Sequence, residues 1–198
     1  VESAEITPED PRTNDIVVAN FLPSDPDGDT VSLSIQWFVD EVEIVGENTP
    51  FLDGTIHFEK GQSIKAVATP SDGVLTGASA TSNTVVVLNT PPTIPDVLVT
   101  PNPAEAGISN LTCTIVQESE DDDQDSIVYT YDWIDASGEI QRHVPHVESL
   151  TDVLPPEMVT PGPWTCTVTP YDGEDHGEPD SDTTLVNGAC NALSFANV

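Results

Sequence analysis

Basic side chains are almost absent from this sequence. Lys and Arg together number 4 among 198 residues, whereas Asp and Glu number 35, so the formal net charge is −31. Such a surface repels the phosphates of nucleic acids and anionic lipids, and we expect neither as a partner. Its like charges also destabilise the compact state unless salt or bound cations screen them. The excess therefore indicates adaptation to a salty or acidic exterior, specific binding of divalent cations, or both.

Signals for membrane insertion and for catalysis are absent as well. No apolar run is long enough to cross a bilayer, so we expect no membrane insertion. The chain has neither an initiator Met nor a signal peptide, and we expect a processed or excised segment. It contains no Gly-x-Ser-x-Gly turn, no Gly-rich phosphate loop and no Cys and His placed for nucleophilic work. We therefore expect no enzyme.

Two of the three cysteines organise the second half of the chain. Cys113 and Cys166 flank Trp133, and each lies in a run where every second residue is large and apolar or Cys. This is the period of a strand with one face in a core, and the Cys–Trp–Cys pattern is the core signature of an immunoglobulin-type sandwich. The cysteines would face each other across two sheets, and a loop of about 50 residues closed this way contributes roughly 4 kcal/mol. A plausible disulfide, few lysines and 18 prolines indicate an oxidising exterior.

An internal repeat divides the chain into two copies. Residues 31–37 match 127–133, and residues 66–73 match 166–173. The period of about 100 residues is the usual size of one sandwich domain. The sequence thus predicts an all-β fold of two tandem immunoglobulin-like β-sandwiches in an elongated arrangement. The expected segments are domain 1 at 1–90, domain 2 at 91–190 and a tail at 191–198.

The two copies differ in what holds their cores together. Copy one has Val17 and Ala66 at the positions of the two cysteines, so we expect it to be the less stable half when no ions are bound. Pro91 and Pro92 cannot continue a ladder and should stiffen the joint between the copies. The expected strands of copy one are 3–7, 15–21, 31–39, 42–45, 55–58, 63–69 and 80–88. Those of copy two are 96–100, 110–116, 127–135, 139–143, 149–154, 163–171 and 182–187.

Several stretches resemble a family of repeats. The runs DDDQDSIVYTYDWIDASGE and WTCTVTPYDGEDHGEPDSDT resemble the tandem Ig-like repeats of very large bacterial and archaeal surface proteins. The run SDPDGDTVSLSIQW is similar to the corresponding segment of PKD and cadherin-like domains. The resemblance covers residues 4–187 and implies a stalk, an adhesin, a surface-layer or filament component, or an accessory module of a secreted hydrolase. Copy one departs from it by lacking the cysteine pair.

An acidic loop in copy one is a candidate calcium site. Asp25, Asp27 and Asp29 occupy alternate positions of a tight turn, which brings negative charges close together. Unpaired, such charges raise carboxylate pKa values or open the loop. Ca2+ removes that penalty because it accepts flexible sets of oxygen ligands. The alternative is a solvated Asp/Gly turn.

Copy two has an acidic loop at the equivalent place. Aligned through the tryptophans, Asp27 falls on Asp123 and Asp29 falls on Asp125. Its candidate ligands for Ca2+ or Mg2+ are Glu120, Asp121, Asp123 and Asp125. A repeated acidic loop at one pole of each domain is better evidence than a single loop.

Other acidic residues and the histidines have simpler interpretations. Asp72-Gly73 and Asp172-Gly173 are hairpin turns by their own chemistry. The later acidic run can add to a cation-attracting surface; its members are Glu174, Asp175, Glu178, Asp180 and Asp182. His143, His146 and Glu148, with His57 and His176, could ligate zinc but lack the usual spacing, and exposed loop histidines are the alternative.

Three further features concern modification and assembly. Asn110 begins an N-glycosylation sequon; either it carries a glycan or the sequon arose by chance. Cys190 has no partner in this segment and could pair with another repeat or subunit. The tail at 191–198 is either a linker into a further domain or a strand donated to a neighbour's open sheet edge.

These observations favour a non-catalytic extracellular structural module, stiffened by Ca2+, whose partners are neighbouring repeats or identical subunits. The alternative is an accessory module that binds a glycan or a cell-surface protein. Glycan sites are commonly lined by exposed aromatic residues, whereas Trp37, Trp133 and Trp164 all lie on inward-facing strand positions. The sequence therefore favours the structural function.

Overall fold

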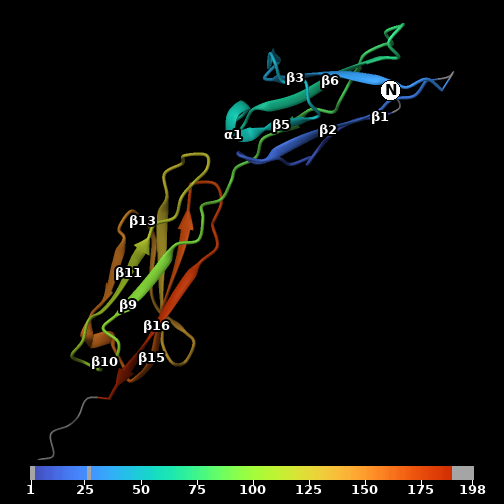
Figure 1. The fold of residues 1–198 in the computed structure, drawn as a ribbon. Coiled ribbons are helices and arrows are strands. Elements are labelled where there is room, and N and C mark those ends of the chain that lie inside the picture. The colour runs from blue at the N-terminus through green and yellow to red at the C-terminus, as the bar shows by residue number, and fades with distance from the viewer. Residues whose placement is uncertain (1–2, 26–27, 189–198) are drawn as a thin grey trace, which may run out of the picture. The chain divides into compact units, whose positions relative to one another are not determined.

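A computed structural model describes residues 3–25 and 28–188. The chain divides into two compact units, Val1–Thr90 and Pro91–Val198, called unit 1 and unit 2 below. Figure 1 colours unit 1 from blue to green and unit 2 from green to red. Nearly all regular structure in both units is β-strand, so the predicted all-β class is confirmed.

Unit 1 contains two sheets. One has the order β1-β2-β5, formed by Ser3–Thr7, Ile16–Leu22 and Phe51–Asp53. The other has the order β4-β3-β6-β7, formed by Val42–Glu43, Ser32–Val39, Ser63–Ser71 and Ala80–Thr81. Strand β8 (Val85–Val86) also pairs with β6.

Alternating apolar residues from both sheets form the core of unit 1. Val17 and Ala66, which replace the cysteines, are fully buried together with Trp37. Trp37 donates its indole Nε1–H to the Thr49 carbonyl at 2.9 Å. The core of this unit thus depends on apolar burial, without a covalent bond between its sheets.

Two expected strands of unit 1 are wrong. Residues 55–58 were expected as a strand, but α1 (Gly54–His57) is a single helical turn. It begins where the Asp53 carboxylate accepts the N–H of Thr55 at 3.0 Å, which is an N-cap bond. The expected strand 80–88 is split into β7 and β8, because the Ser82 hydroxyl accepts the Ala66 N–H at 2.9 Å in place of a ladder carbonyl.

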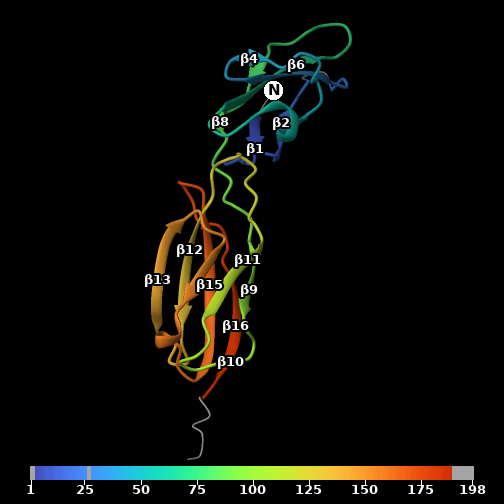
Figure 2. The same cartoon turned by 90° about the vertical axis from the view of Figure 1, so that its left-hand side faces the viewer.

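Unit 2 also contains two sheets, which Figure 2 shows from the side. The smaller has the order β14-β11-β9, formed by Thr151–Leu154, Leu111–Gln117 and Asp96–Thr100. The larger has the order β10-β16-β15-β12-β13, formed by Ala104–Glu105, Asp180–Asn187, Gly162–Tyr171, Val128–Ile134 and Ile140–Val147. A 3-10 turn, η1 (Pro156–Met158), follows β14.

A disulfide joins the two sheets of unit 2. Cys113 on β11 and Cys166 on β15 are bonded, and both are fully buried. Trp133 on β12 is the ladder neighbour of Cys166 and belongs to the same core. The predicted bond between the sheets is confirmed, and so is the inward direction of Trp37, Trp133 and Trp164.

A second contact joins the sheets at their β13–β14 side. The Asp152 carboxylate on β14 accepts two bonds from the Arg142 guanidinium on β13, at 2.9 and 2.8 Å. It also accepts the Trp133 indole Nε1–H at 2.8 Å. Desolvation raises the pKa of Asp152, but the hydrogen bonds from Arg142 and Trp133 together outweigh it, so the pKa lies below its ordinary value.

No helix within residues 3–25 and 28–188 is long and apolar enough to cross a membrane.

Replacing Arg142 with Met is expected to lower the free energy of unfolding of unit 2 by about 2 kcal/mol at pH 7, because the largely desolvated Asp152 carboxylate loses its two hydrogen bonds to the guanidinium. Since the folded-state pKa of Asp152 is lowered, this contribution is present above the ordinary carboxyl pKa and disappears as the pH falls through the folded value. Urea unfolding at pH 7 and at acidic pH measures the difference. The exposed pair between Lys65 and Glu41 gives the control Lys65→Met, expected to cost at most about 1 kcal/mol. Equal losses in both variants would contradict the assigned role of Arg142.

Candidate cation-binding loops

The loop between β11 and β12 folds around the side chain of Asp121. Its Oδ1 accepts the backbone N–H of Asp123 at 2.8 Å and that of Asp125 at 3.2 Å. The Gln124 N–H donates to the Asp121 carbonyl at 3.1 Å, and Gln124 has a φ of 64°, in the left-handed region. These bonds turn the chain so that alternate carboxylates face the same side.

Three carboxylates come together in this loop. One oxygen from each of Asp121, Asp123 and Asp125 lies within 4.8 Å of the others, and all three residues are half-buried. Two oxygens bound to one Ca2+ at about 2.4 Å each can be at most about 4.8 Å apart, so the spacing suits this ion. The Glu120 side chain is not part of the group. Its backbone N–H instead donates to the Thr93 hydroxyl at 2.7 Å.

The electrostatics of the loop favour a cation. Desolvation is the largest effect on Asp121 and raises its pKa; the nearby charges of Asp123 and Asp125 raise it further, against two backbone hydrogen bonds that lower it. The second oxygen of Asp121, Oδ2, is inaccessible to solvent and accepts no hydrogen bond. A hard cation bound between the three carboxylates would offset the repulsion among their charges.

The acidic loop of unit 1 repeats this geometry where it is described. Asp29 donates its N–H to Asp25 Oδ1 at 3.2 Å, and Gly28 donates its N–H to the Asp25 carbonyl at 3.3 Å. Gly28 has a φ of 84°, in the same left-handed region as Gln124. The alignment of the two loops is therefore confirmed for the backbone. Asp27 lies outside the described residues.

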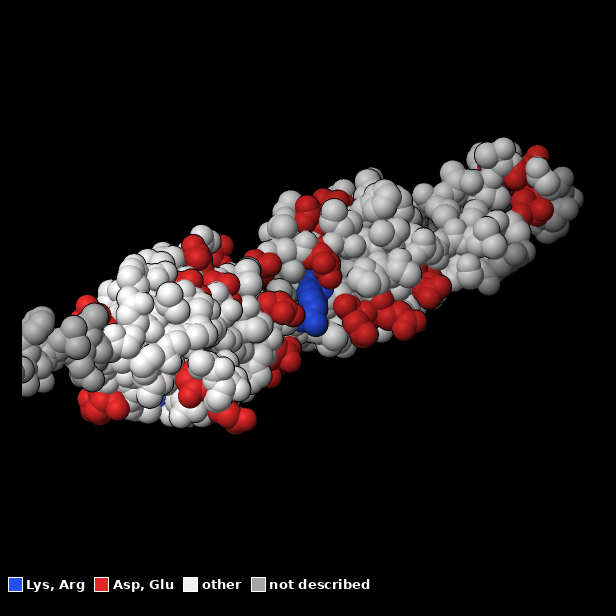
Figure 3. Space-filling model, turned by 90° about the horizontal axis from the view of Figure 1, so that it is seen from below, with Lys and Arg blue, Asp and Glu red and all other residues white. Residues whose placement is uncertain are grey.

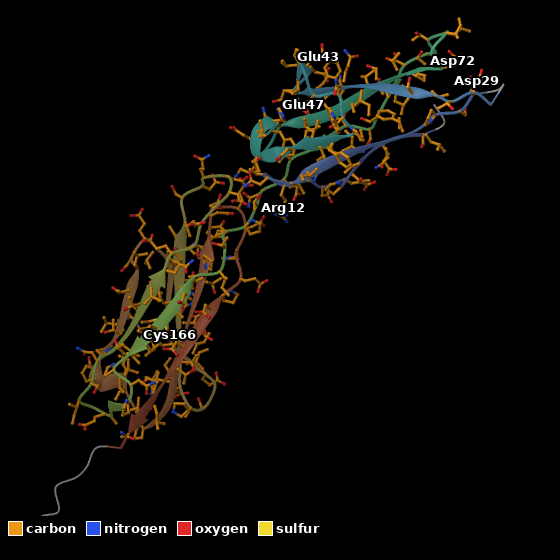
Figure 4. All side chains as sticks on the ribbon, viewed as in Figure 1. Arg12, Asp29, Glu43, Glu47, Asp72 and Cys166 are labelled. Atoms are coloured by element: carbon orange, nitrogen blue, oxygen red, sulfur yellow. A yellow bond between two sulfur atoms is a disulfide. The ribbon has the colours of Figure 1, made fainter. Side chains whose placement is uncertain are left out.

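The two Asp-Gly pairs are turn residues, as predicted. Asp72 Oδ1 accepts the N–H groups of Val74 and Leu75, both at 2.7 Å. Asp172 Oδ1 accepts those of Glu174 and Asp175 at the same distances. Figure 4 shows Asp72 at the same end of unit 1 as Asp29.

The histidines lie at three separate places. His143 Nδ1 is 2.6 Å from an oxygen of Asp132, and His57 Nε2 is 3.4 Å from Glu47. His146 stacks on Tyr171 with ring centroids 4.8 Å apart, and His176 lies 6.1 Å from His146. None of the four histidines belongs to a group of described residues that could hold a metal ion.

The remaining candidate residues are placed only in part. Asn110 is exposed immediately before β11. Cys190 and the tail at 191–198 lie outside the described residues.

Sequence reasoning missed the role of two acidic residues on β16. Asp182 accepts the Val99 N–H at 2.8 Å, and Asp180 accepts the Val97 N–H at 3.0 Å. Both had been assigned to a general cation-attracting surface. Their spacing of two along a strand, which puts both on one face, was the available signal.

Comparisons with known proteins bear on the fold. No protein-family model and no curated protein matches the sequence. The chicken interferon gamma receptor alpha chain aligns with 93% of this chain and 96% of its own, at 9% identity and a TM-score of 0.52. A segment of two fibronectin type III domains from chicken tenascin aligns with 92% of this chain and 97% of its own, at 10% identity and a TM-score of 0.51. The chain has the fold of two tandem immunoglobulin-like β-sandwiches. At such low identity the likeness extends to the fold alone.

Replacing Asp121 with Asn is expected to raise the melting temperature of unit 2 in chelator at pH 7. The folded-state pKa of Asp121 is raised, so its ionisation costs stability as the pH rises through that value, and an amide avoids the cost. We expect a rise of roughly 2–4 °C once solvent screening of a partly exposed group is allowed for, disappearing near pH 4. Scanning calorimetry measures it. Asp122→Asn removes the same charge from an exposed neighbour outside the group and is the control. A lower melting temperature for Asp121→Asn than for this control would contradict the assignment.

Proposed function

We propose that the chain is a non-catalytic, extracellular spacer module of a bacterial or archaeal surface protein, and that Ca2+ bound at its acidic loops stiffens it. Its place would be a surface layer, an adhesin stalk or a filament, with neighbouring repeats or identical subunits as partners. The observation that carries the cation part is the convergence of one carboxylate oxygen each from Asp121, Asp123 and Asp125 to within 4.8 Å of one another.

The charge distribution supports this function. Figure 3 shows Asp and Glu spread over the visible surface, with few Lys or Arg among them. Such a surface concentrates divalent cations and repels nucleic acids and anionic membranes. Cation binding at fixed points would also relieve the self-repulsion of a chain with a net charge of −31.

The positions of the aromatic and acidic side chains favour a structural function rather than a binding function. The three tryptophans are at most 1% exposed and belong to the two cores. Several carboxylates accept backbone N–H groups and so hold turns and strands in place, as Asp72 and Asp180 do. The sequence resemblance to large surface proteins with tandem repeats is in keeping with a spacer.

Calcium is expected to raise the melting temperature of unit 2 at constant ionic strength. For a Kd of about 1 mM, within the range of extracellular modules, about 10 mM Ca2+ adds about 1.4 kcal/mol, or roughly 5–8 °C. Calorimetry with Ca2+, with chelator and with an equal ionic strength of NaCl separates binding from general screening. Asp122→Asn should respond like the wild type, and Asp121→Asn should lose most of the shift. If NaCl and Ca2+ raise the melting temperature equally, the effect is general screening of charge, and specific Ca2+ binding is contradicted.

A binding module is the second candidate, favoured by one end of unit 1. A pocket of about 280 Å³ lies between the β2–β3 and β6–β7 loops, and its lining includes Asp25, Asp72 and Leu75. Val74 and Leu75 at the adjoining loop tip are 89% and 71% exposed. Apolar side chains beside a polar pocket are typical of a contact surface for a glycan or a protein.

The binding alternative is tested with the whole chain on a glycan array. If unit 1 binds a glycan through this end, the wild type should give a signal that Leu75→Ser reduces at least about tenfold, since a buried Leu contact contributes roughly 1.5–3 kcal/mol. Val45→Ser changes another highly exposed apolar residue, in the β4–β5 connection away from the pocket, and is the control. The spacer function expects no signal from any of the three proteins.

A further inference from the structure

The first and last strands of unit 2 run in parallel and are bonded along their length. Figures 1 and 2 both draw β9 beside β16. Three side chains on β16 connect it to the backbone of the opening segment, and all three bonds span 83 residues of sequence. These are the bonds of Asp180 to Val97 N–H, Asp182 to Val99 N–H, and the Thr184 hydroxyl to the Pro101 carbonyl.

The connection continues as a backbone ladder beyond Thr184. Strand β10 pairs in parallel with β16, with Ala104 opposite Val186 and Glu105 opposite Asn187. The Ala106 N–H then donates to the Asn187 carbonyl at 3.0 Å. The side-chain bonds of Asp180, Asp182 and Thr184 and this short ladder together form one row, called the terminal clasp below.

Unit 1 has a shorter version of the same connection. Asn83 Oδ1 accepts the Ile6 N–H at 2.7 Å, and the Leu88 N–H donates to the Pro11 carbonyl at 2.7 Å. Arg12 and Leu88 form a parallel bridge. An amide oxygen here does what the carboxylates of Asp180 and Asp182 do in unit 2, so the neutral acceptor is sufficient for the contact.

Parallel pairing of terminal strands determines how the bonds respond to tension. A pull on the two ends of unit 2 draws β9 and β10 toward the N-terminus and β16 toward the C-terminus. Because the strands are parallel, they must slide past each other, and every bond of the row is strained at once. An antiparallel pair pulled at adjacent ends would instead lose its bonds one after another.

We propose that unit 2 bears tension between its ends, and that Asp180 and Asp182 are the residues that set how fast it opens under load. This inference rests on the proposed spacer function, because a spacer in a surface protein is pulled at its ends. Each carboxylate holds a backbone N–H that β9 does not use in its ladder to β11, since that ladder lies on the other side of the strand. Unit 1, with its shorter row, is expected to open first.

Single-molecule force spectroscopy on the whole chain tests the proposal. The chain is held by its ends at constant force, in chelator, so that the result does not depend on Ca2+. The double variant Asp180→Ala/Asp182→Ala is expected to open unit 2 at least about tenfold faster than the wild type, because two charge-assisted hydrogen bonds are lost before the transition state. The variant Asp180→Asn/Asp182→Asn should stay within about threefold of the wild type, because the amide oxygen accepts the same N–H groups.

Two controls separate the clasp from general effects. Glu139→Ala/Glu178→Ala removes the same two charges from exposed positions and should open unit 2 at the wild-type rate. Arg142→Met lowers equilibrium stability at the β13–β14 side and should leave the opening rate within about threefold of the wild type, since Arg142 bonds Asp152 and contributes no bond to the terminal clasp. Urea unfolding of every variant verifies that it folds.

The proposal is overturned if the Ala pair leaves the opening rate unchanged, or if Arg142→Met accelerates opening as much as the Ala pair does. An Asn pair that opens as fast as the Ala pair would overturn the role of these side chains as hydrogen-bond acceptors. A negative result in the force experiment does not contradict calcium binding at the Asp121 loop. Likewise, a missing calcium response does not contradict the role of Asp180 and Asp182 under load.

Discussion

Backbone N–H groups donate hydrogen bonds to many Asp side chains of this protein, which has few lysines and arginines to pair with its carboxylates. The chain has so few cations that ion pairing can serve only a few of its acidic residues. The Asp side chains that accept backbone N–H groups include Asp15, Asp25, Asp40, Asp53, Asp72, Asp121, Asp135, Asp172, Asp180 and Asp182. Backbone hydrogen bonds from Ser63 and Leu75 are the largest cause of the lowered pKa values of Asp40 and Asp72. These carboxylates thus fix turns and strand contacts.

The Asp121 loop is the exception that carries functional interest. There the backbone serves only one oxygen of a desolvated carboxylate, and two further carboxylates lie close by. In the turns at Asp72 and Asp172 a single carboxylate caps a tight turn, and the hydrogen bonds lower the pKa of Asp72. The contrast between a raised pKa at Asp121 and a lowered one at Asp72 separates a candidate ligand from a structural turn residue within one chain.

Sequence patterns predicted the architecture because alternating burial is local and repeated. The tryptophans, the disulfide, the two-copy organisation and the Asp-Gly turns all follow from spacing that a single strand or turn reveals. The helical turn α1 was missed because its four residues carry no helical period, and only the cap at Asp53 marks its start. The left-handed Gln124 could not be predicted, since a residue other than Gly rarely adopts that conformation. The partners of Asp180 and Asp182 lie 83 residues away in the sequence. The strand pattern therefore indicated that both side chains lie on one face, but it could not identify the N–H groups that they accept.

The disulfide between Cys113 and Cys166 limits how far the chain can reach. The bond spans 53 residues, which stay looped even when the strands around them have separated. At about 3.4 Å per residue, an opened unit 2 with the bond intact is about 180 Å shorter than the same unit after reduction. Unit 1 contains no cysteine and can release its whole contour length. The two units therefore differ in how much chain they release when unfolded. Unit 1 always releases its full length, whereas unit 2 does so only in surroundings that reduce its disulfide.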